Sequence, residues 1–141
     1  MTAQDRPTCR IIRPDSTYRG AQGFDYFAGI ARETVGSTGI CMHLLTIEPG
    51  QRARAHKHEH HETAIYVLDG EAQMWFGERL EELMHLKAGD LLYIPADMPH
   101  LPANFGDRPC TAVIARTDPN EQESVVLLPD LDGLVGITES T

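Results

Sequence analysis

The sequence predicts an all-β protein, built as a sandwich or barrel of short strands. Short runs rich in β-branched and aromatic residues recur along the chain, and turn signals separate them about every 8–12 residues. No long segment shows the spacing of an amphipathic helix. The 141 residues, 41% of them hydrophobic, suffice for one domain with its own core. We therefore expect a single domain over residues 1–141.

The first half of the chain holds one clear strand at residues 39–47, GICMHLLTI, which ends at the turn Glu48-Pro49-Gly50. This strand is apolar on both faces, so we expect it to be buried inside the sandwich. Residues 24–33, FDYFAGIARE, fit either another strand with aromatic anchors or the beginning of a helical turn. The sequence leaves both interpretations open.

The second half reads as a meander of short strands. Residues 63–68 and 71–77 form a hairpin around Asp69-Gly70. Residues 80–86, LEELMHL, have some helical spacing, but the strands on either side favour a strand there too. Further strands are expected at residues 91–94, 100–105 and 110–115.

The two ends of the chain differ in composition from the middle. Residues 1–23 form an arm with four arginines that packs either on its own domain or on a partner subunit. Residues 36–116 form the expected barrel core. The tail, residues 117–141, is acidic and turn-rich with one apolar patch, VVLLP, and we expect it to cover the barrel or to contact a partner.

Composition argues against several classes of protein. The net charge of −9 argues against binding to nucleic acid or to an anionic membrane surface. No apolar run approaches the length of about 20 residues that a membrane-spanning helix needs, and the first residues lack a signal-peptide pattern. Three widely separated cysteines fit a reducing compartment. We therefore expect a cytoplasmic protein with no membrane partner.

Residues 56–62, HKHEHHE, carry the strongest functional signal. Crowded imidazoles repel one another when protonated, and neutral imidazole is the commonest metal ligand in proteins. His56 and His58 are two residues apart, so both side chains point to one face of an extended strand. The spacing therefore predicts two ligands of a divalent metal ion.

A third ligand must come from His60, His61 or Glu62. Alternation from His58 favours His60 and Glu62, whereas counting back from the turn at residue 70 favours His61. The two counts agree only if one extra residue forms a bulge. We predict His61 as the ligand, with His60 or Glu62 beside it.

A second stretch, residues 89–104, contains a turn, a short apolar strand and a proline-rich loop that holds His100. Prolines stiffen a loop, and a stiff loop can aim one side chain accurately. His100 is therefore a candidate ligand from a distant part of the chain.

Together the two stretches resemble the paired motifs of the cupin superfamily, G-x5-H-x-H-x(3 or 4)-E-x6-G and G-x5-P-x-G-x2-H-x3-N. The matching positions are Gly50, His56, His58, Gly70, Gly89, Pro95, His100 and Asn104. Two positions depart from the pattern. Asp97 stands at a motif glycine, and Thr63 stands where the four-residue spacing places the glutamate ligand.

The resemblance implies a jelly roll of roughly eight strands and a homodimer. With threonine at the glutamate position, the surplus of histidines predicts a four-histidine site made of His56, His58, His61 and His100. Such a site would hold one divalent metal per chain. Zinc is favoured, and nickel and iron(II) also accept imidazole ligands.

Within that superfamily, the chain is similar to the metal-binding cyclases of bacterial aromatic polyketide pathways. This resemblance implies intramolecular aldol cyclisation and dehydration of a poly-β-ketone, a hydrophobic small molecule that an acyl carrier protein could deliver. Our candidates for acid–base catalysis are His43, His60 and Glu62. His43 serves this role only if its strand face lines the cavity; otherwise it is a hydrogen-bonded core histidine.

Two other functions remain open. One is a cupin dioxygenase that uses a redox metal and O2, and the other is a metal-dependent module that binds a small molecule without catalysis. Methionines and aromatic residues are plentiful around the motifs, and a pocket lined by them would suit a flat or folded apolar substrate. They are Met42, Met74, Met84, Met98, Trp75, Phe76, Tyr66, Tyr93 and Phe105.

Overall fold

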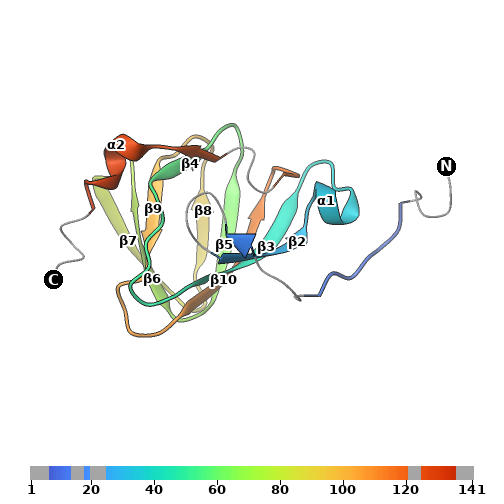
Figure 1. Cartoon of the computed structure of the whole chain (residues 1–141), viewed down its shortest axis with the longest axis horizontal. Helices are drawn as coiled ribbons and strands as arrows, with labels where there is room; N and C mark the ends of the chain where they lie inside the picture. The colour runs from blue at the N-terminus through green and yellow to red at the C-terminus, as the bar shows by residue number, and fades with distance from the viewer. Residues whose placement is uncertain (1–6, 14–17, 20–24, 121–124, 136–141) are drawn as a thin grey trace.

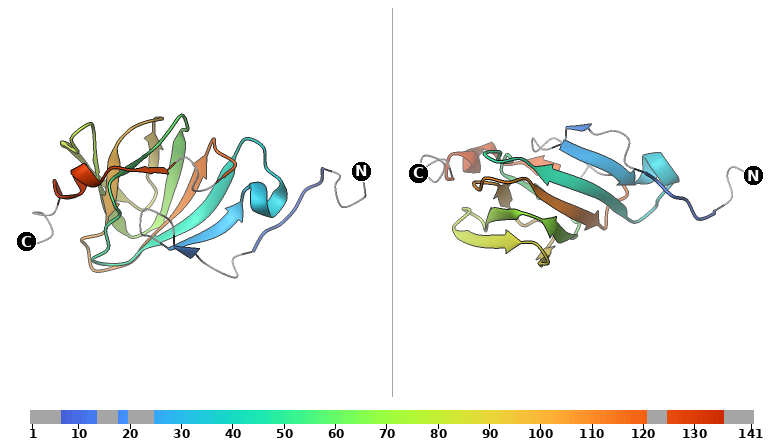
Figure 2. Two further views of the ribbon diagram at one scale, coloured as in Figure 1. Left: turned by 45° about the horizontal axis from the view of Figure 1, so that its top comes forward. Right: turned by 90° about the horizontal axis from the view of Figure 1, so that it is seen from below.

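Two antiparallel β-sheets face each other in this protein (Figures 1 and 2). The computed structural model of the chain describes residues 7–13, 18–19, 25–120 and 125–135. The strand order is β1-β2-β3-β10-β5-β8 in the first sheet and β11-β4-β9-β6-β7 in the second. The predicted all-β fold is confirmed.

The first sheet has six strands in the described part of the chain. Its strands are β1 (Tyr18–Arg19), β2 (Asp25–Ile30), β3 (Cys41–Ile47), β10 (Cys110–Arg116), β5 (Thr63–Asp69) and β8 (Leu91–Ile94). Strand β10 lies between β3 and β5; it pairs with β3 over its whole length and with β5 from Thr111 to Arg116. A single strand from late in the chain therefore fixes the register of two early ones.

The second sheet carries the histidine motifs. Its strands are β11 (Val125–Leu127), β4 (His56–His58), β9 (His100–Ala103), β6 (Glu71–Phe76) and β7 (Glu82–Lys87). Residues 82–87 form a strand, as the surrounding meander predicted. Residues 24–33 contain both of the alternatives expected there, since β2 is followed by the helical turn α1 (Arg32–Val35).

The prediction that residues 39–47 are buried on both faces is wrong. Cys41, His43, Leu45 and Ile47 are buried on the inner face of β3, but Met42 on the outer face is 42% exposed. An antiparallel sheet can leave one face open to solvent, and apolar residues on that face do not require a covering layer.

The core lies between the two inner faces. Leu45, Val67 and Ile114 of the first sheet pack with Ala72 of β6 in one buried cluster. A second cluster joins Met74 of β6 to residues of β8. Alternation along each strand places these side chains inward and their neighbours outward. Near β4, the interior between the sheets is lined by His56, His58 and His100.

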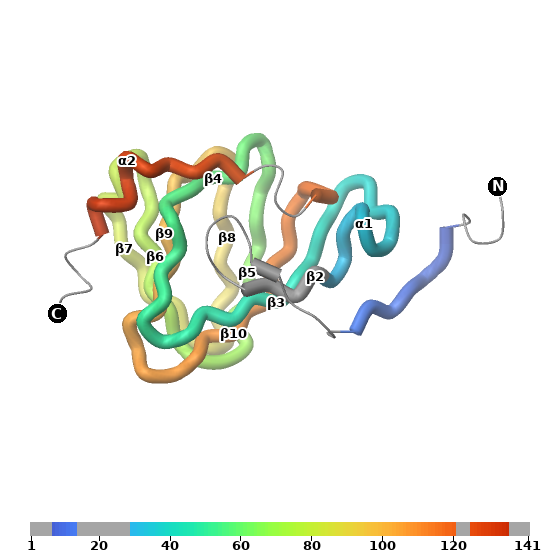
Figure 3. Tube along the Cα trace, in the orientation of Figure 1, coloured from blue at the N-terminus to red at the C-terminus, as the bar shows by residue number. Residues whose placement is uncertain are grey.

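The C-terminal segment covers the outer face of the second sheet. Strand β11 pairs with β4, and the short helix α2 (Pro129–Asp132) follows it across the sheet (Figure 3). Leu131 and Val135 pack on Leu101 and Trp75, all of them 9% exposed or less. The expected covering of the barrel by the tail is therefore seen for residues 129–135, whereas residues 125–127 join the edge of the sheet. None of the described helices has the length and apolarity to cross a membrane.

Several motif positions are explained by backbone geometry. Gly70 has a φ of 81°, and a Cβ there would lie 2.2 Å from the carbonyl oxygen of Pro109. Asp97, at the position of a motif glycine, has a φ of 64°, a left-handed conformation that aspartate tolerates better than most residues. The buried Asn104 amide donates to the carbonyl oxygens of Ile47 and Arg108 at 2.9 and 2.7 Å. These positions shape turns rather than the chemistry of the site.

Candidate metal centre

Three histidines converge inside one end of the sandwich. His56 and His58 come from β4, and His100 comes from the neighbouring strand β9, where it is the register partner of His56. Each is 3% exposed or less. One ligand nitrogen of each lies within 4.8 Å of those of the other two. Two segments about 40 residues apart in sequence therefore supply one compact group of nitrogen ligands.

Backbone carbonyls set the orientation of two of these rings. The Nδ1 atom of His56 lies 2.7 Å from the carbonyl oxygen of Arg54, and Nδ1 of His100 lies 2.9 Å from that of Met98. A carbonyl oxygen only accepts hydrogen bonds, so Nδ1 carries the proton in both rings. Nε2 is then the nitrogen with a lone pair for a metal.

Burial keeps the three imidazoles neutral. It is the largest cause of a lowered pKa at each ring, and it brings the pKa of His100 down to about 4. The positive charge of Arg116 lowers all three pKa values further. Neutral imidazoles at fixed separation are the donor set that divalent transition metals accept. The residues present thus fit a metal, and the cluster could bind one.

The histidines line a small, mainly apolar cavity of about 50 Å³ between the sheets. Its walls are aliphatic side chains from both sheets, such as Leu45 and Val67 of the first and Leu86 of the second. Among the described residues that line it there is no aspartate or glutamate. Of the nine methionine and aromatic candidates, only Met74 is in the lining, so the wall is not the aromatic one considered above.

Thr63 and Arg116 complete the cavity beside the histidines. They are register partners on β5 and β10, and the Nε–H group of Arg116 donates to Thr63 Oγ1 at 3.0 Å. Both residues are buried, with exposures of 2% and 4%. At the position where the motif expects an anionic ligand, this chain has a hydroxyl that holds a cation.

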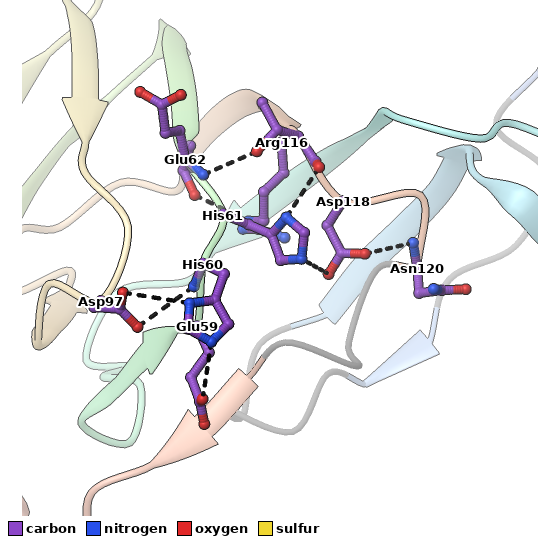
Figure 4. A network of polar contacts seen from close by, with 10 residues as sticks. Glu59, His60, His61, Glu62, Asp97, Arg116, Asp118 and Asn120 are labelled. Atoms are coloured by element: carbon purple, nitrogen blue, oxygen red, sulfur yellow. Dashed lines mark hydrogen bonds and ion pairs between the residues drawn. The ribbon is translucent and has the colours of Figure 1, made fainter.

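His61 does not join the cluster. It lies in the loop before β5, where Nδ1 is 3.0 Å from the Thr117 carbonyl oxygen and Nε2 is 4.0 Å from Asp118 Oδ2 (Figure 4). The inward alternation of β5 stops at Thr63, because the chain turns at His60, which has a φ of 64°. Counting back through this turn placed His61 inward, and the structure corrects that expectation.

His60 and Glu62 also lie outside the cavity. The His60 side chain is 80% exposed and lies between the carboxylates of Glu59 and Asp97, 3.8 and 3.9 Å away (Figure 4). The Glu62 carboxylate accepts a hydrogen bond from the Tyr93 hydroxyl. An acid–base role for either residue would require this loop to rearrange.

His43 lies next to the cluster without lining the cavity itself. It is 1% exposed on the inner face of β3, and electrostatic interaction between the two rings contributes to the lowered pKa of His58. Burial, with a smaller effect of Arg116, lowers the pKa of His43 to about 3. Its ring is therefore neutral at physiological pH.

The residue that the sequence argument missed is Arg116. Its signal is the alternation of β10, in which Cys110, Ala112 and Ile114 point inward and Arg116 is next in phase. An arginine at the end of an apolar strand reads as a solvated terminus, so nothing in the local pattern marks it as buried.

Comparison with known proteins places these features in context. The family model described as "Cupin domain" matches residues 43–115. The chain is 36% identical over 74 residues to polyketide synthase CurC of Streptomyces cyaneus, which covers 52% of this chain and 46% of CurC. It is 33% identical over 87 residues to protein SchB of Streptomyces halstedii, covering 61% and 60%. The chain thus spans about half to three-fifths of these relatives.

Solved structures of oxalate decarboxylase share the fold. One whose subject is the Mn(II) centres of the Bacillus subtilis enzyme superposes with a TM-score of 0.65 at 25% identity, over 77% of this chain and 29% of that one. The Lactobacillus farciminis enzyme in complex with formate gives a TM-score of 0.67 at 21% identity, over 80% and 33%. The second likeness bears on the fold alone.

Proposed function

Because the chain belongs to the cupin domain family, we propose that it is a metal-dependent cyclase acting on a poly-β-ketone by intramolecular aldol reaction and dehydration. The observation that carries the proposal is the composition of the site. Three buried neutral imidazoles are present, with a threonine in place of the carboxylate ligand and no acidic residue among the described residues of the cavity wall. A metal held by neutral ligands keeps its full positive charge, so this site would stabilise the negative charge of an enolate better than a site with an anionic ligand would.

The metal would be divalent, with zinc favoured and nickel or iron(II) also suited to the ligands. When bound, it would supply Lewis acidity that polarises a carbonyl and acidifies the C–H group between two carbonyls. Three protein ligands leave a coordination position open for the substrate. The surrounding chain provides the rest of the chemistry.

The residues of the chain would position the substrate and move the proton. We propose His43 as the proton acceptor, because its buried ring is unprotonated at neutral pH and lies beside the histidine cluster. This role requires the ring to turn into the cavity, since His43 is not part of the cavity wall. In the aldol step the α-proton leaves, the freed carbon bonds to a carbonyl carbon of the same molecule, and the carbonyl oxygen gains a proton. Loss of that hydroxyl with a neighbouring hydrogen then releases water. The apolar walls would hold the two carbons together and exclude bulk water.

The size of the cavity limits what can enter. A volume of about 50 Å³ holds only about four water-sized groups. We therefore propose that the reacting dicarbonyl segment occupies the cavity while the remaining substrate, whether free or attached to a carrier protein, lies at its mouth. The name of the relative CurC, a polyketide synthase, supports this substrate class.

The test combines metal analysis with a cyclisation assay. Protein purified without added metal is analysed by elemental mass spectrometry, then reconstituted with zinc and given a synthetic poly-β-ketone. We expect one metal per chain and a cyclised, dehydrated product detected by mass spectrometry. The H56A variant provides the matched control, which should bind no metal and form no product above the buffer rate. Stoichiometric zinc with no cyclised product from any poly-β-ketone tested would overturn the proposal.

A redox enzyme is the second candidate, favoured by the structural likeness to oxalate decarboxylase. It predicts that the purified protein holds manganese, iron or copper rather than zinc. The decisive measurement is oxygen consumption by protein loaded with each metal. A rate that follows the redox-active metals and is absent with zinc would replace the cyclase proposal.

A further inference from the structure

Arg116 is a charged side chain in an apolar interior. It ends β10, is 4% exposed and lines the same cavity as His56, His58 and His100. Arginine remains protonated in such surroundings because of its high pKa. The cavity therefore contains a permanent positive charge.

Thr63 holds this cation in a defined orientation. The Nε–H group of Arg116 donates to Thr63 Oγ1 at 3.0 Å, and the two residues are register partners on adjacent strands. The threonine stands at the position of the motif glutamate. The chain has thus exchanged a negative ligand for a hydroxyl that anchors a positive group beside the histidines.

The charge acts on the whole cluster. Arg116 lines the same cavity as His56, His58 and His100. Its charge lowers the pKa of these three rings and of His43. No aspartate or glutamate is found among the described residues of the cavity wall. An added divalent cation would increase the positive charge of this space further.

We propose that Arg116 binds an anionic oxygen of the substrate, a carboxylate or the enolate of a 1,3-dicarbonyl, next to the metal position. A planar guanidinium suits two oxygens on one carbon skeleton better than a lysine ammonium does. The cavity volume of about 50 Å³ matches an acidic head group of a few atoms. This inference deepens the proposed function by naming the recognised group, but it can be tested without metal or turnover.

The probe pair is acetate and acetamide, which have nearly the same shape and differ in charge. Metal-free protein labelled with ¹⁵N is titrated with each at constant ionic strength, and the arginine Nε–H signals are followed by NMR. The R116K variant assigns the Arg116 signal by its disappearance. We expect acetate to shift this signal saturably and acetamide to bind at least about tenfold more weakly.

Variants separate this site from general charge effects. R116Q should lower acetate affinity at least tenfold, and R116K should restore only part of it. R108Q is the matched control, because Arg108 is a surface residue, 64% exposed, paired with Asp69 at 2.9 Å. Its acetate affinity should equal that of the wild type. Thermal melts establish that the variants are folded, and if R116Q is not, the wild-type titration decides alone.

Two results would overturn the inference: equal affinity for acetate and acetamide, or no response of the Arg116 signal to acetate. Acetate binding without cyclisation would overturn only the proposed function. Cyclisation at an unchanged KM and kcat in folded R116Q would instead overturn the assignment of Arg116 and leave the cyclase proposal in place.

Discussion

Arg116 and Thr63 face each other across the β10–β5 pair, and the arginine donates a hydrogen bond to the threonine hydroxyl inside the sandwich. At this position the motif has a glutamate that binds metal through a negatively charged oxygen. In this chain Thr63 stands there and positions the positively charged guanidinium of Arg116. The electrostatic character of the site follows from this exchange. It distinguishes this chain from the general motif more than the histidines do.

Removing the hydroxyl of Thr63 tests this contact. Thr63→Val keeps the shape of the side chain but leaves the buried Nε–H of Arg116 without its acceptor. We expect the free energy of unfolding to fall by about 1–3 kcal/mol. Thr111→Val on β10, where the threonine is part-exposed on the outer face, should change it by less than about 0.5 kcal/mol. Equal effects of the two substitutions in urea denaturation would contradict the structural role of the contact.

Metal affinity distinguishes the buried histidines from the loop histidines. Alanine at His56, His58 or His100 should weaken zinc binding by at least about 100-fold, measured by competition with a chelator. His60→Ala should leave affinity unchanged, because that side chain is 80% exposed. His61→Ala decides whether the fourth ligand predicted from the sequence contributes. A loss as large as that of the buried three would show that its loop folds inward around metal.

The lowered pKa values of the buried histidines predict acid sensitivity of the metal-free protein. In the unfolded chain these groups titrate near 6.5, whereas His100 and His43 titrate at about 4 and about 3 when folded. As the pH falls below 6.5, the unfolded state takes up protons first, so this contribution to stability is complete above 6.5 and is lost toward 4.

We expect the free energy of unfolding to fall by more than about 2 kcal/mol between about pH 7 and about pH 5. Urea denaturation at a series of pH values measures this fall in stability. The pH range from about 7 to about 5 lies above the range in which most carboxylates titrate. Constant stability across this range would contradict the burial of neutral imidazoles.

Gly70 and Gly89 form a matched pair for the turns. Both have positive φ, 81° and 96°, but only at Gly70 would a Cβ meet backbone, 2.2 Å from the Pro109 carbonyl oxygen. Gly89→Ala should cost about 1–2 kcal/mol from backbone conformation alone. Gly70→Ala should cost clearly more, about 3 kcal/mol or above. Similar midpoints in thermal melts would show that the strands around Gly70 move apart freely.

Packing of the C-terminal segment is tested by two leucines. Leu131 is 8% exposed and packs with Leu101, whereas Leu134 is 44% exposed. Leu131→Ala should lower the free energy of unfolding by about 2–4 kcal/mol, and Leu134→Ala by less than about 1 kcal/mol. The difference is read from denaturation midpoints of the two variants.

The main strands and both segments that carry the clustered histidines could be predicted from sequence, because they depend on local pattern and motif spacing. Alternation identified His56 and His58 as neighbours on one face, and motif spacing brought His100 to them. The position of His61 could not be predicted by alternation, since a single left-handed residue, His60, ends the period. Whether an outer face such as that of β3 is covered depends on the tertiary arrangement, which the strand itself does not encode.

The burial of Arg116 belongs to the same class of unpredictable features. Its inward orientation follows from the phase of β10, but its burial depends on β5 lying alongside with Thr63 in register. That register joins residues more than 50 positions apart, and no local pattern specifies it. A charged residue at a strand end is ordinarily solvated.

The pairing of β11 with β4 has a consequence for how the protein responds to metal. Leu127 and Val125 are the register partners of His56 and His58, so the ligand-bearing strand is internal to its sheet only while the C-terminal segment is docked. Undocking would leave three residues at a sheet edge with two ligands on them. Because a metal would bind the arrangement in which β4 is paired with β11, metal binding would also stabilise the docked C-terminal segment. Amide hydrogen exchange in residues 125–127 should therefore slow when metal binds, so a segment distant in sequence would report whether the site is occupied.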